Sequence, residues 1–244
     1  MLASTKSLRN DMTTVAIMQP YFLPYIGYFQ LIAAVDVFVV YDNIKYTKKG
    51  WINRNRLLQN GKDAIFSLPL KKDSDSLDVV QRELATDFDR NKLLNQFQGA
   101  YAKAPYFEQV FPLLERIVRY EERNLFRYIH YSITQVCACL GIKTDIRISS
   151  EIRVDHGLKA QDKVLALCHA LHADRYINPI GGMEIYDRDI FRMNHVALEF
   201  IRSKPFDYVQ RGSSFVPWLS IMDVMMFNAP EQVSQVIRNG YELV

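Results

Sequence analysis

The stretch AIMQPYFLPYIGYFQLIAAVDVFVVYDN, Ala16 to Asn43, decides the fold class. Two short apolar runs, Val15–Gln19 and Val37–Tyr41, are rich in β-branched and aromatic residues and therefore predict buried strands. Between them, Ile26–Ala34 is apolar enough to form a helix packed on a sheet. A helix that joins two such strands is a βαβ unit, which implies that the strands are parallel neighbours.

The rest of the chain extends this α/β pattern. Helical spacing over about residues 87–140 predicts an insert of three helices, which Gly141 ends. Further strands are expected at 143–149, 175–178 and 197–201, with helices at 160–171 and 217–227. Strands at 51–56 and 64–68 flank the hairpin turn Asn60-Gly61.

Together these elements predict a parallel, Rossmann-like α/β sheet with the helical insert and with the hairpin at its edge. The polar, patternless residues 1–13 are expected to form a disordered tail. Residues 14–244 then form a single domain.

Composition limits the classes of function. The chain of 244 residues is 49% hydrophobic and carries a formal charge of only +3, so no basic field for nucleic acid is expected. Its three cysteines fit no disulfide framework or zinc spacing. No apolar stretch has the length of a membrane span or the features of a signal peptide, so a cytoplasmic protein without membrane contact is expected. The oligomeric state stays open.

The turn after the first strand is the first candidate binding segment. Ligands of an open parallel sheet lie beyond the carboxyl ends of its strands, where Gln19 begins the turn. Gly27 allows close approach of the backbone to a ligand, and Tyr25 and Tyr28 offer aromatic walls for a sugar or base. The alternative is that these rings only pack in the core.

The second segment, YDNIKYTKKGWINRNR, adds a carboxylate and an amide-rich strand. Asp42 directly follows the second strand and is a candidate catalytic or orienting carboxylate. On an extended strand Trp51, Asn53 and Asn55 share one face, which would hold a sugar or base, while Arg54 and Arg56 on the other would clamp a diphosphate. The alternative for the arginines is protection of an edge strand.

Loops further along the chain reach the same predicted edge of the sheet. Ser149, Ser150, Lys159, Asn178 and Gly182 follow strands or precede a helix, which makes them candidate ligand contacts or routine connections.

Among the histidines, only one is a candidate for acid–base chemistry. His156 lies in a loop beside acidic and basic side chains. No histidine or cysteine spacing defines a metal site.

Several stretches resemble the WbqC-like proteins, and they occur in the same order along the chain. They are MQPYFLPYIGYFQLI, VFVVYDNIKYTKKGWINRNR, KAPYF, LGIKT, SSEI and FVPWLSIMDVMMFNAPE. The resemblance covers residues 15 to about 237. Members occur in bacterial gene clusters for O-antigen (lipopolysaccharide) and related surface polysaccharides, beside enzymes that build unusual nucleotide-linked amino sugars. The resemblance implies a cytoplasmic role in making or decorating such sugars.

A looser likeness bears on mechanism. Tyr25-Ile26-Gly27-Tyr28 occupies the turn where nucleotidylyltransferases and pantoate-activating ligases carry H-x-G-H, with tyrosine here in place of both histidines. Tyrosine cannot supply a cationic imidazole to a transferred phosphate, so the likeness implies shared architecture without adenylyl chemistry.

Two functional hypotheses remain. The first is a transferase that moves an activated acyl or aminoacyl group onto a nucleotide-linked amino sugar, with Asp42 or His156 as the base. The second is a non-catalytic protein of the same pathway that binds a nucleotide-sugar or a partner enzyme. No resident cofactor is expected for either.

Overall fold

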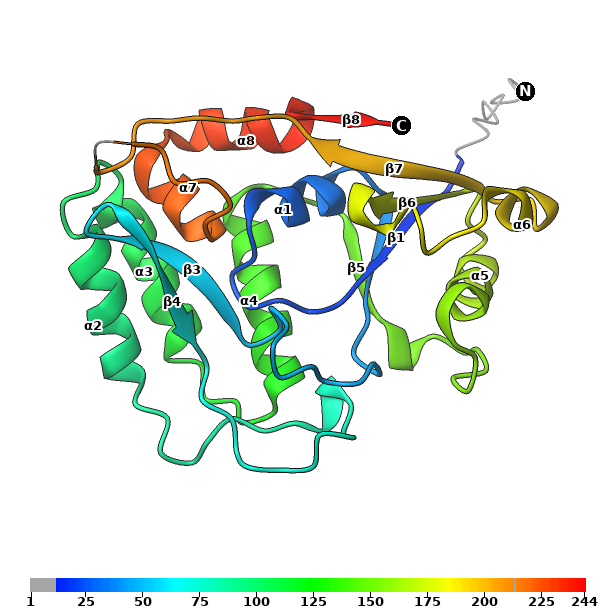
Figure 1. The fold of residues 1–244 in the computed structure, drawn as a ribbon, viewed down its shortest axis with the longest axis horizontal. Coiled ribbons are helices and arrows are strands. Elements are labelled where there is room, and N and C mark those ends of the chain that lie inside the picture. The colour runs from blue at the N-terminus through cyan, green and yellow to red at the C-terminus, as the bar shows by residue number, and fades with distance from the viewer. Residues whose placement is uncertain (1–11, 213) are drawn as a thin grey trace, which may run out of the picture.

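A mostly parallel sheet forms the centre of the computed structural model, which describes residues 12–212 and 214–244 (Figure 1). Apart from Met12 and Thr13, the tail expected over residues 1–13 lies outside the described residues. The six strands lie in the order β5-β2-β1-β6-β7-β8, and only β8 is antiparallel to its neighbour. Their bounds are β1 Thr14–Met18, β2 Val37–Val40, β5 Asp145–Ile148, β6 Arg175–Pro179, β7 Ala197–Ser203 and β8 Tyr241–Leu243.

The predicted βαβ unit at the start of the chain is confirmed. Helix α1, Ile26–Ala33, joins β1 to β2, and these strands pair in parallel with Val15 opposite Val37. Apart from Thr14 at the start of β1, both strands are apolar, because helices cover both faces of the sheet and leave no face for polar side chains.

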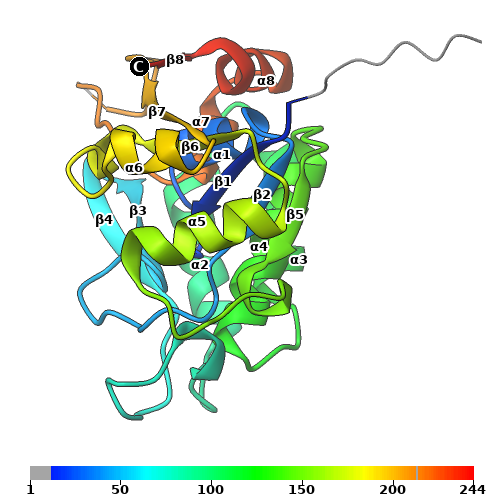
Figure 2. The ribbon, with the colours of Figure 1, turned by 90° about the vertical axis from the view of Figure 1, so that its right-hand side faces the viewer.

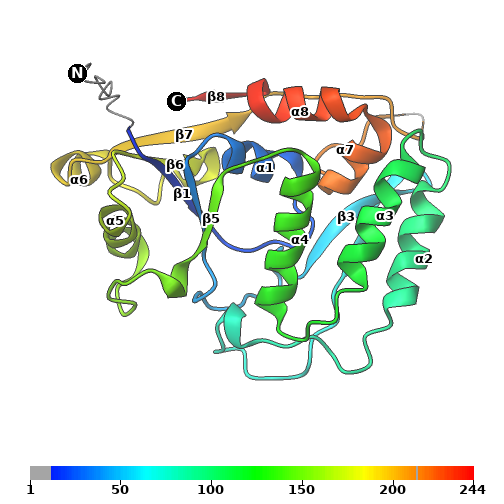
Figure 3. The same cartoon turned by 180° about the vertical axis from the view of Figure 1, so that it is seen from behind.

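Successive side chains of the strands enter two hydrophobic clusters, one on each face. Val15, Ile17 and Val39 pack with helices α5 (Ala160–Ala170) and α6 (Arg188–Met193). Ala16 and Phe38 face the other way, into the cluster that contains α1, α4 (Leu125–Cys139) and α8 (Pro230–Asn239). Figure 2 shows α5 in front of the sheet, and Figure 3 shows α1, α4 and α8 from behind. The sheet is therefore the middle layer of three.

The helical insert also forms as predicted. It comprises α2, Arg90–Tyr101, α3, Phe107–Val118, and α4. Asp89 and Asn124 cap α2 and α4 by accepting hydrogen bonds from backbone N–H groups of the first turn. The helix predicted at 217–227 is α7, Ile221–Phe227. It starts four residues later than predicted, directly after its N-cap Ser220. Short 3₁₀ turns η1, η2 and η3 span Val79–Gln81, Ser149–Glu151 and Ile180–Gly182.

The hairpin forms with the predicted turn, but it does not lie at the edge of the central sheet as predicted. Strands β3, Arg54–Gln59, and β4, Lys62–Ser67, meet at Asn60-Gly61, where both residues have the positive φ of a tight hairpin turn. They form a separate two-stranded sheet, so the expectation that they extend the central sheet is wrong. The reason is apolar packing: Phe66 of β4 contacts Phe22 and Phe97 edge-on, which holds the hairpin on the first turn and α2.

Every helix among the described residues is too short or too polar to cross a bilayer.

Candidate functional site

A large cavity lies beyond the carboxyl ends of β1 and β6. Numbered along the chain within this sheet alone, the strands run 3-2-1-4-5-6, so β1 and β6 are the neighbours from which the chain proceeds in opposite directions. Open α/β sheets bind ligands at such a switch point. The cavity, here called the switch-point cavity, has a volume of about 850 Å³. It is lined by Ile17, Met18, Gln19, Tyr21, Tyr41, Asn43, Ile44, Lys45, His156, Gly157, Leu158, Lys159, Ala160, Val164, Asn178, Pro179, Gly181, Gly182, Ile185 and Tyr186.

His156 lines the switch-point cavity and is held in place by two neighbouring side chains. Its Nδ1 lies 2.9 Å from Asn43 Nδ2 and 2.9 Å from Lys163 Nζ. The Ser149 hydroxyl lies 2.9 Å from Asn43 Oδ1 and fixes the amide in turn. Both contacts to the ring involve Nδ1, which leaves Nε2 as the nitrogen that can meet a ligand.

Lys163 is the residue that the sequence analysis missed. Its side chain is only 1% exposed, and its ammonium nitrogen also donates to the His156 carbonyl oxygen at 3.2 Å and lies 5.7 Å from the centre of the Tyr41 ring. Burial lowers the pKa of Lys163, while the carboxylates of Asp155, Asp42 and Asp78 act in the opposite direction. A buried lysine beside a histidine in a cavity wall is typical of functional sites.

Asp42 is a structural carboxylate at the end of β2. It is fully buried, and its two oxygens accept hydrogen bonds from Ser150, from the backbone N–H at 2.9 Å and from the hydroxyl at 2.6 Å. Neither residue lines the switch-point cavity. The geometry does not support the prediction of Asp42 as a base or of Ser150 as a ligand contact: the two residues bond to each other and fix the turn after β5, from which Ser149 reaches Asn43.

The amides of the hairpin are also structural. Asn53 accepts from the Tyr46 hydroxyl at 2.9 Å and donates to the Leu68 carbonyl at 2.8 Å. Asn55 is buried and donates to the Leu23 carbonyl at 2.9 Å. Strand β3 begins only at Arg54, so the alternation assumed from residue 51 does not hold. The predicted shared pocket of Trp51, Asn53, Asn55, Tyr25 and Tyr28 is wrong.

The two hairpin arginines do not reach the switch-point cavity either. Arg54 donates to the carbonyls of Lys49 and Gly50, and Arg56 pairs with Asp63 and donates to the Trp218 carbonyl. Both guanidinium groups lie within 6 Å of the Trp51 ring centre, at 5.4 and 5.6 Å. Their role as a diphosphate clamp stays a prediction; in the structure they brace the hairpin and an exposed tryptophan.

Of the candidate residues in the first turn, only Gln19 lines the switch-point cavity, whereas Tyr25, Gly27 and Tyr28 do not. Gln19 lines the cavity, but Tyr28 is buried and donates to the Gln19 carbonyl at 2.9 Å. Tyr25 lines a different cavity, and a Cβ at position 27 would collide with its ring. Gly27 therefore makes room for Tyr25 rather than for a ligand.

Lys159, Asn178 and Gly182 do meet at the cavity wall. Lys159 is the N-cap of α5, and Asn178 accepts from the buried Tyr176 hydroxyl at 3.2 Å. A side chain at Gly182 would collide with the Asn178 amide, so glycine is required there for the amide to keep its place.

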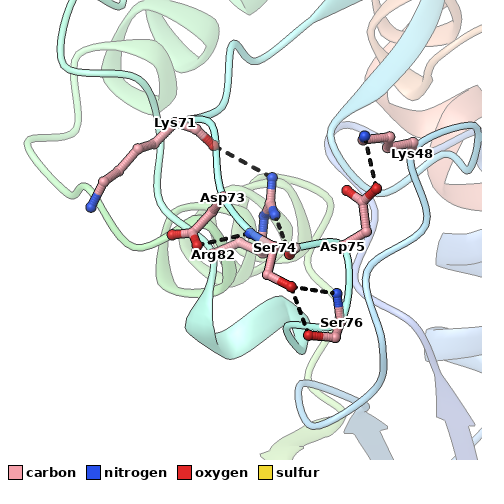
Figure 4. Close-up of polar contacts among 7 residues, drawn as sticks. All are labelled: Lys48, Lys71, Asp73, Ser74, Asp75, Ser76 and Arg82. Carbon is pink, nitrogen blue, oxygen red and sulfur yellow. Dashed lines mark hydrogen bonds and ion pairs between the residues drawn. The ribbon is translucent and has the colours of Figure 1, made fainter.

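The segment from residue 71 to 82 supports the part of the cavity wall that contains Lys45, and Figure 4 shows polar contacts within this segment. Arg82 is buried and donates to the carbonyls of Ser74 and Lys71 at 2.8 and 3.4 Å (Figure 4). Its guanidinium group also lies over the Tyr46 ring, 4.8 Å from the ring centre. The segment then bonds through its backbone to the chain beside Lys45: the Tyr46 N–H donates to the Leu77 carbonyl, and Lys45 and Asp78 form an isolated antiparallel β-bridge. Lys45 is thereby placed in the wall.

The charge of the described lining is one-sided. It contains Lys45, Lys159 and His156 but no aspartate or glutamate. With about 850 Å³, the cavity is in the range of sites for nucleotide-sized ligands. The arrangement therefore suits an extended anion.

Comparison with known proteins agrees with the resemblance. The chain is 26% identical over 230 residues to the uncharacterized protein Rv1507c of Mycobacterium tuberculosis, an alignment that covers 93% of this chain and 98% of that relative. The sequence model of the WbqC-like protein family matches residues 19–235, which include most of the lining of the switch-point cavity. This chain therefore belongs to the WbqC-like protein family.

Proposed function

We propose that the switch-point cavity binds a nucleotide-linked amino sugar and that the protein transfers an acyl group, aminoacyl included, to the sugar amine. The observation that carries the proposal is a nucleotide-sized cavity at the switch point of the sheet, lined by two lysines and no carboxylate. The strand order 3-2-1-4-5-6 supports the proposal, because parallel α/β sheets with this order bind nucleotides at the switch point.

The diphosphate is assigned to the cationic part of the wall. Lys159 stands at the first turn of α5, where free backbone N–H groups favour an anion, and Lys45 lies in the wall formed by the segment after β2. Asn178 and Asn43 offer amides to the sugar or base.

His156 and Lys163 supply the proton acceptor. With Lys163 neutral and the Asn43 amide flipped, so that Oδ1 faces the ring and Nδ2 donates to the Ser149 hydroxyl, His156 Nδ1–H donates to Nζ. The lone pair of Nε2 can then take the proton that the sugar ammonium must lose before it attacks. Nδ1–H then passes its proton to Lys163. Burial lowers the pKa of Lys163 and so favours the neutral lysine from which this transfer starts, while the carboxylates of Asp155, Asp42 and Asp78 stabilise the charged lysine that the transfer produces.

The transfer step itself needs no redox partner. The amine nitrogen forms a bond to the acyl carbon, the bond from that carbon to its leaving group breaks, and the leaving group departs with the electron pair. The family's occurrence in clusters for bacterial surface polysaccharides, as the sequence resemblance implies, supports an amino sugar as acceptor.

A second candidate is a non-catalytic binding protein of the same pathway. It is favoured by the protonation state in which Lys163 and the Asn43 amide both donate to His156 Nδ1, since Nε2 then carries a proton and only donates hydrogen bonds. In that state the cavity offers donors and no base.

The two candidates are separated by product formation. We expect that UDP-glucosamine incubated with the protein and a panel of acyl and aminoacyl donors will give a sugar heavier by the transferred group, detected by mass spectrometry. The matched His156→Ala variant should bind UDP-glucosamine but form the product at least 100-fold more slowly, the usual range for loss of a general base. Equal product with the variant would contradict the base role. Saturable binding without product for any donor favours the binding protein.

A further inference from the structure

A second, smaller cavity lies between the first turn of α1 and the chain that follows β7. Its volume is about 260 Å³, and its walls are mainly the rings of Tyr25, Phe206, Tyr208, Phe215, Pro217 and Trp218. We call it the aromatic pocket. The chain segments that form it, residues 25–26, 203–208 and 215–224, come together from both ends of the sequence.

The walls are held in place before any ligand arrives. Tyr25 meets Trp218 edge-on at 5.7 Å, and Gly27 leaves the space that the Tyr25 ring occupies. The Tyr208 hydroxyl donates to the buried Asp223 at 2.7 Å, and the Tyr208 ring meets Phe215 at 5.2 Å. A pocket fixed in this way loses little conformational entropy on binding.

Trp218 is presented outward by its backbone. It is 61% exposed and has a φ of +61°, a left-handed conformation that is rare for a bulky residue. Arg56 donates to its carbonyl at 3.0 Å, and the following Ser220 donates to the Leu23 carbonyl at 2.7 Å. Strained, exposed and firmly held aromatic residues of this kind occur at binding sites.

The polar groups at the walls indicate what can enter. The Ser203 hydroxyl already donates to Gln30 at 2.6 Å, and the Tyr208 hydroxyl is taken by Asp223. Lys204 and Asp207 also line the pocket, and both are exposed to solvent. A sugar placed inside would have to give up hydrogen bonds to water for few new ones, which is costly, whereas an apolar group would not.

We propose that the aromatic pocket is a ligand site for an uncharged apolar group of about nine non-hydrogen atoms. The size follows from the volume, which is about nine times the roughly 30 Å³ of one water molecule in the liquid. In the transfer reaction proposed above, this group would be the apolar part of the acyl donor. Binding in the pocket does not depend on that reaction, and its test uses no nucleotide-sugar.

The chain offers a fluorescent reporter for this test. It contains two tryptophans, Trp51 and Trp218, so a Trp51→Phe protein leaves Trp218 as the sole tryptophan at the pocket. Titrated with benzyl alcohol and with 1-hexanol, this protein should show a saturable change in tryptophan emission with Kd on the order of 1 mM, as expected for ligands of this size.

Variants test whether the signal comes from the pocket. Phe215→Ala in the same background should raise Kd at least fivefold, and Ile26→Phe, which fills the space beside α1, should abolish saturation. Tyr120→Ala, which alters a stacked pair on the far helices, should leave Kd unchanged. Melting curves exclude unfolded variants from the comparison.

Other outcomes would overturn the proposal. No site exists if the tryptophan emission changes linearly with alcohol concentration. The same conclusion follows if the change is equal in the protein with the unaltered pocket and in the Ile26→Phe protein. Saturable binding of glucose or tetramethylammonium without binding of the alcohols would mean that the aromatic walls serve a sugar or a cation instead.

Discussion

Replacing Asp42 by alanine is expected to lower the free energy of unfolding by about 3–5 kcal/mol, because hydrogen bonds to a charged group contribute about 1.5–3 kcal/mol each. Asp42 is fully buried and accepts two, both from Ser150. In a chain of this size the melting temperature should fall by roughly 10 °C. Urea unfolding measures the first quantity and calorimetry the second.

The matched control lies at the other end of β2. Asp36 is exposed and accepts a hydrogen bond from the Thr14 backbone N–H at 2.8 Å, so Asp36→Ala should cost about 1 kcal/mol or less. If Asp42→Ala kept the melting temperature of the wild type and lost turnover, Asp42 would be a functional carboxylate and its assignment to the turn after β5 would be wrong.

Replacing Lys163 by methionine is expected to lower turnover by 100- to 10,000-fold with UDP-glucosamine binding within a factor of two, because the variant removes the proton acceptor behind His156. Lys163→Arg should be equally inactive, since arginine keeps the charge but cannot accept a proton. Turnover retained by the arginine variant would contradict the proton transfer. Initial rates and calorimetric titration measure the two quantities.

The effect of Lys163→Met on the free energy of unfolding should depend on pH, in a direction that follows from the pKa of the lysine. Burial holds the pKa of Lys163 below its usual 10.5, so in the fold the lysine releases its proton at a lower pH than in the unfolded chain. The unfolded chain then binds more protons between those two pKa values, and stability rises with pH across that window. Lys163→Met should remove this rise and gain most in stability at pH values below the window. The rising limb of wild-type turnover should follow the same pKa.

The elements that the sequence predicted well are those whose pattern is local. Val15 and Val37 lie in short, continuous apolar runs, which are typical of strands that are covered on both faces. Asp89 and Asn124 cap helices within the predicted insert. Strand β8 and helix α6 were not predicted. They have three and six residues, too few for a period to show, and β8 depends on pairing with the distant β7.

The lining of the switch-point cavity was predicted in part, for a physical reason. Gln19, His156, Lys159, Asn178 and Gly182 all line the switch-point cavity, because strand ends of a parallel sheet must meet at one edge. The hairpin residues do not, because β3 and β4 form a separate two-stranded sheet that packs on the first turn and α2 instead of extending the central sheet. Lys163 had a signal in its position on the apolar face of α5, one turn before Leu167, but lysines are so seldom buried that the pattern favours exposure.

Calorimetric titration with UDP-glucosamine tests the central claim most directly, namely that the switch-point cavity binds a nucleotide-linked sugar through its diphosphate. We expect one site per chain with Kd on the order of 10 μM, about −7 kcal/mol. Lys45→Ala and Lys159→Ala should each weaken binding about tenfold, while Lys103→Ala, an exposed lysine outside the cavity lining, should not change it. UDP alone should bind at the same site. The absence of saturable heat, or an affinity that neither cavity lysine alters, would contradict the account.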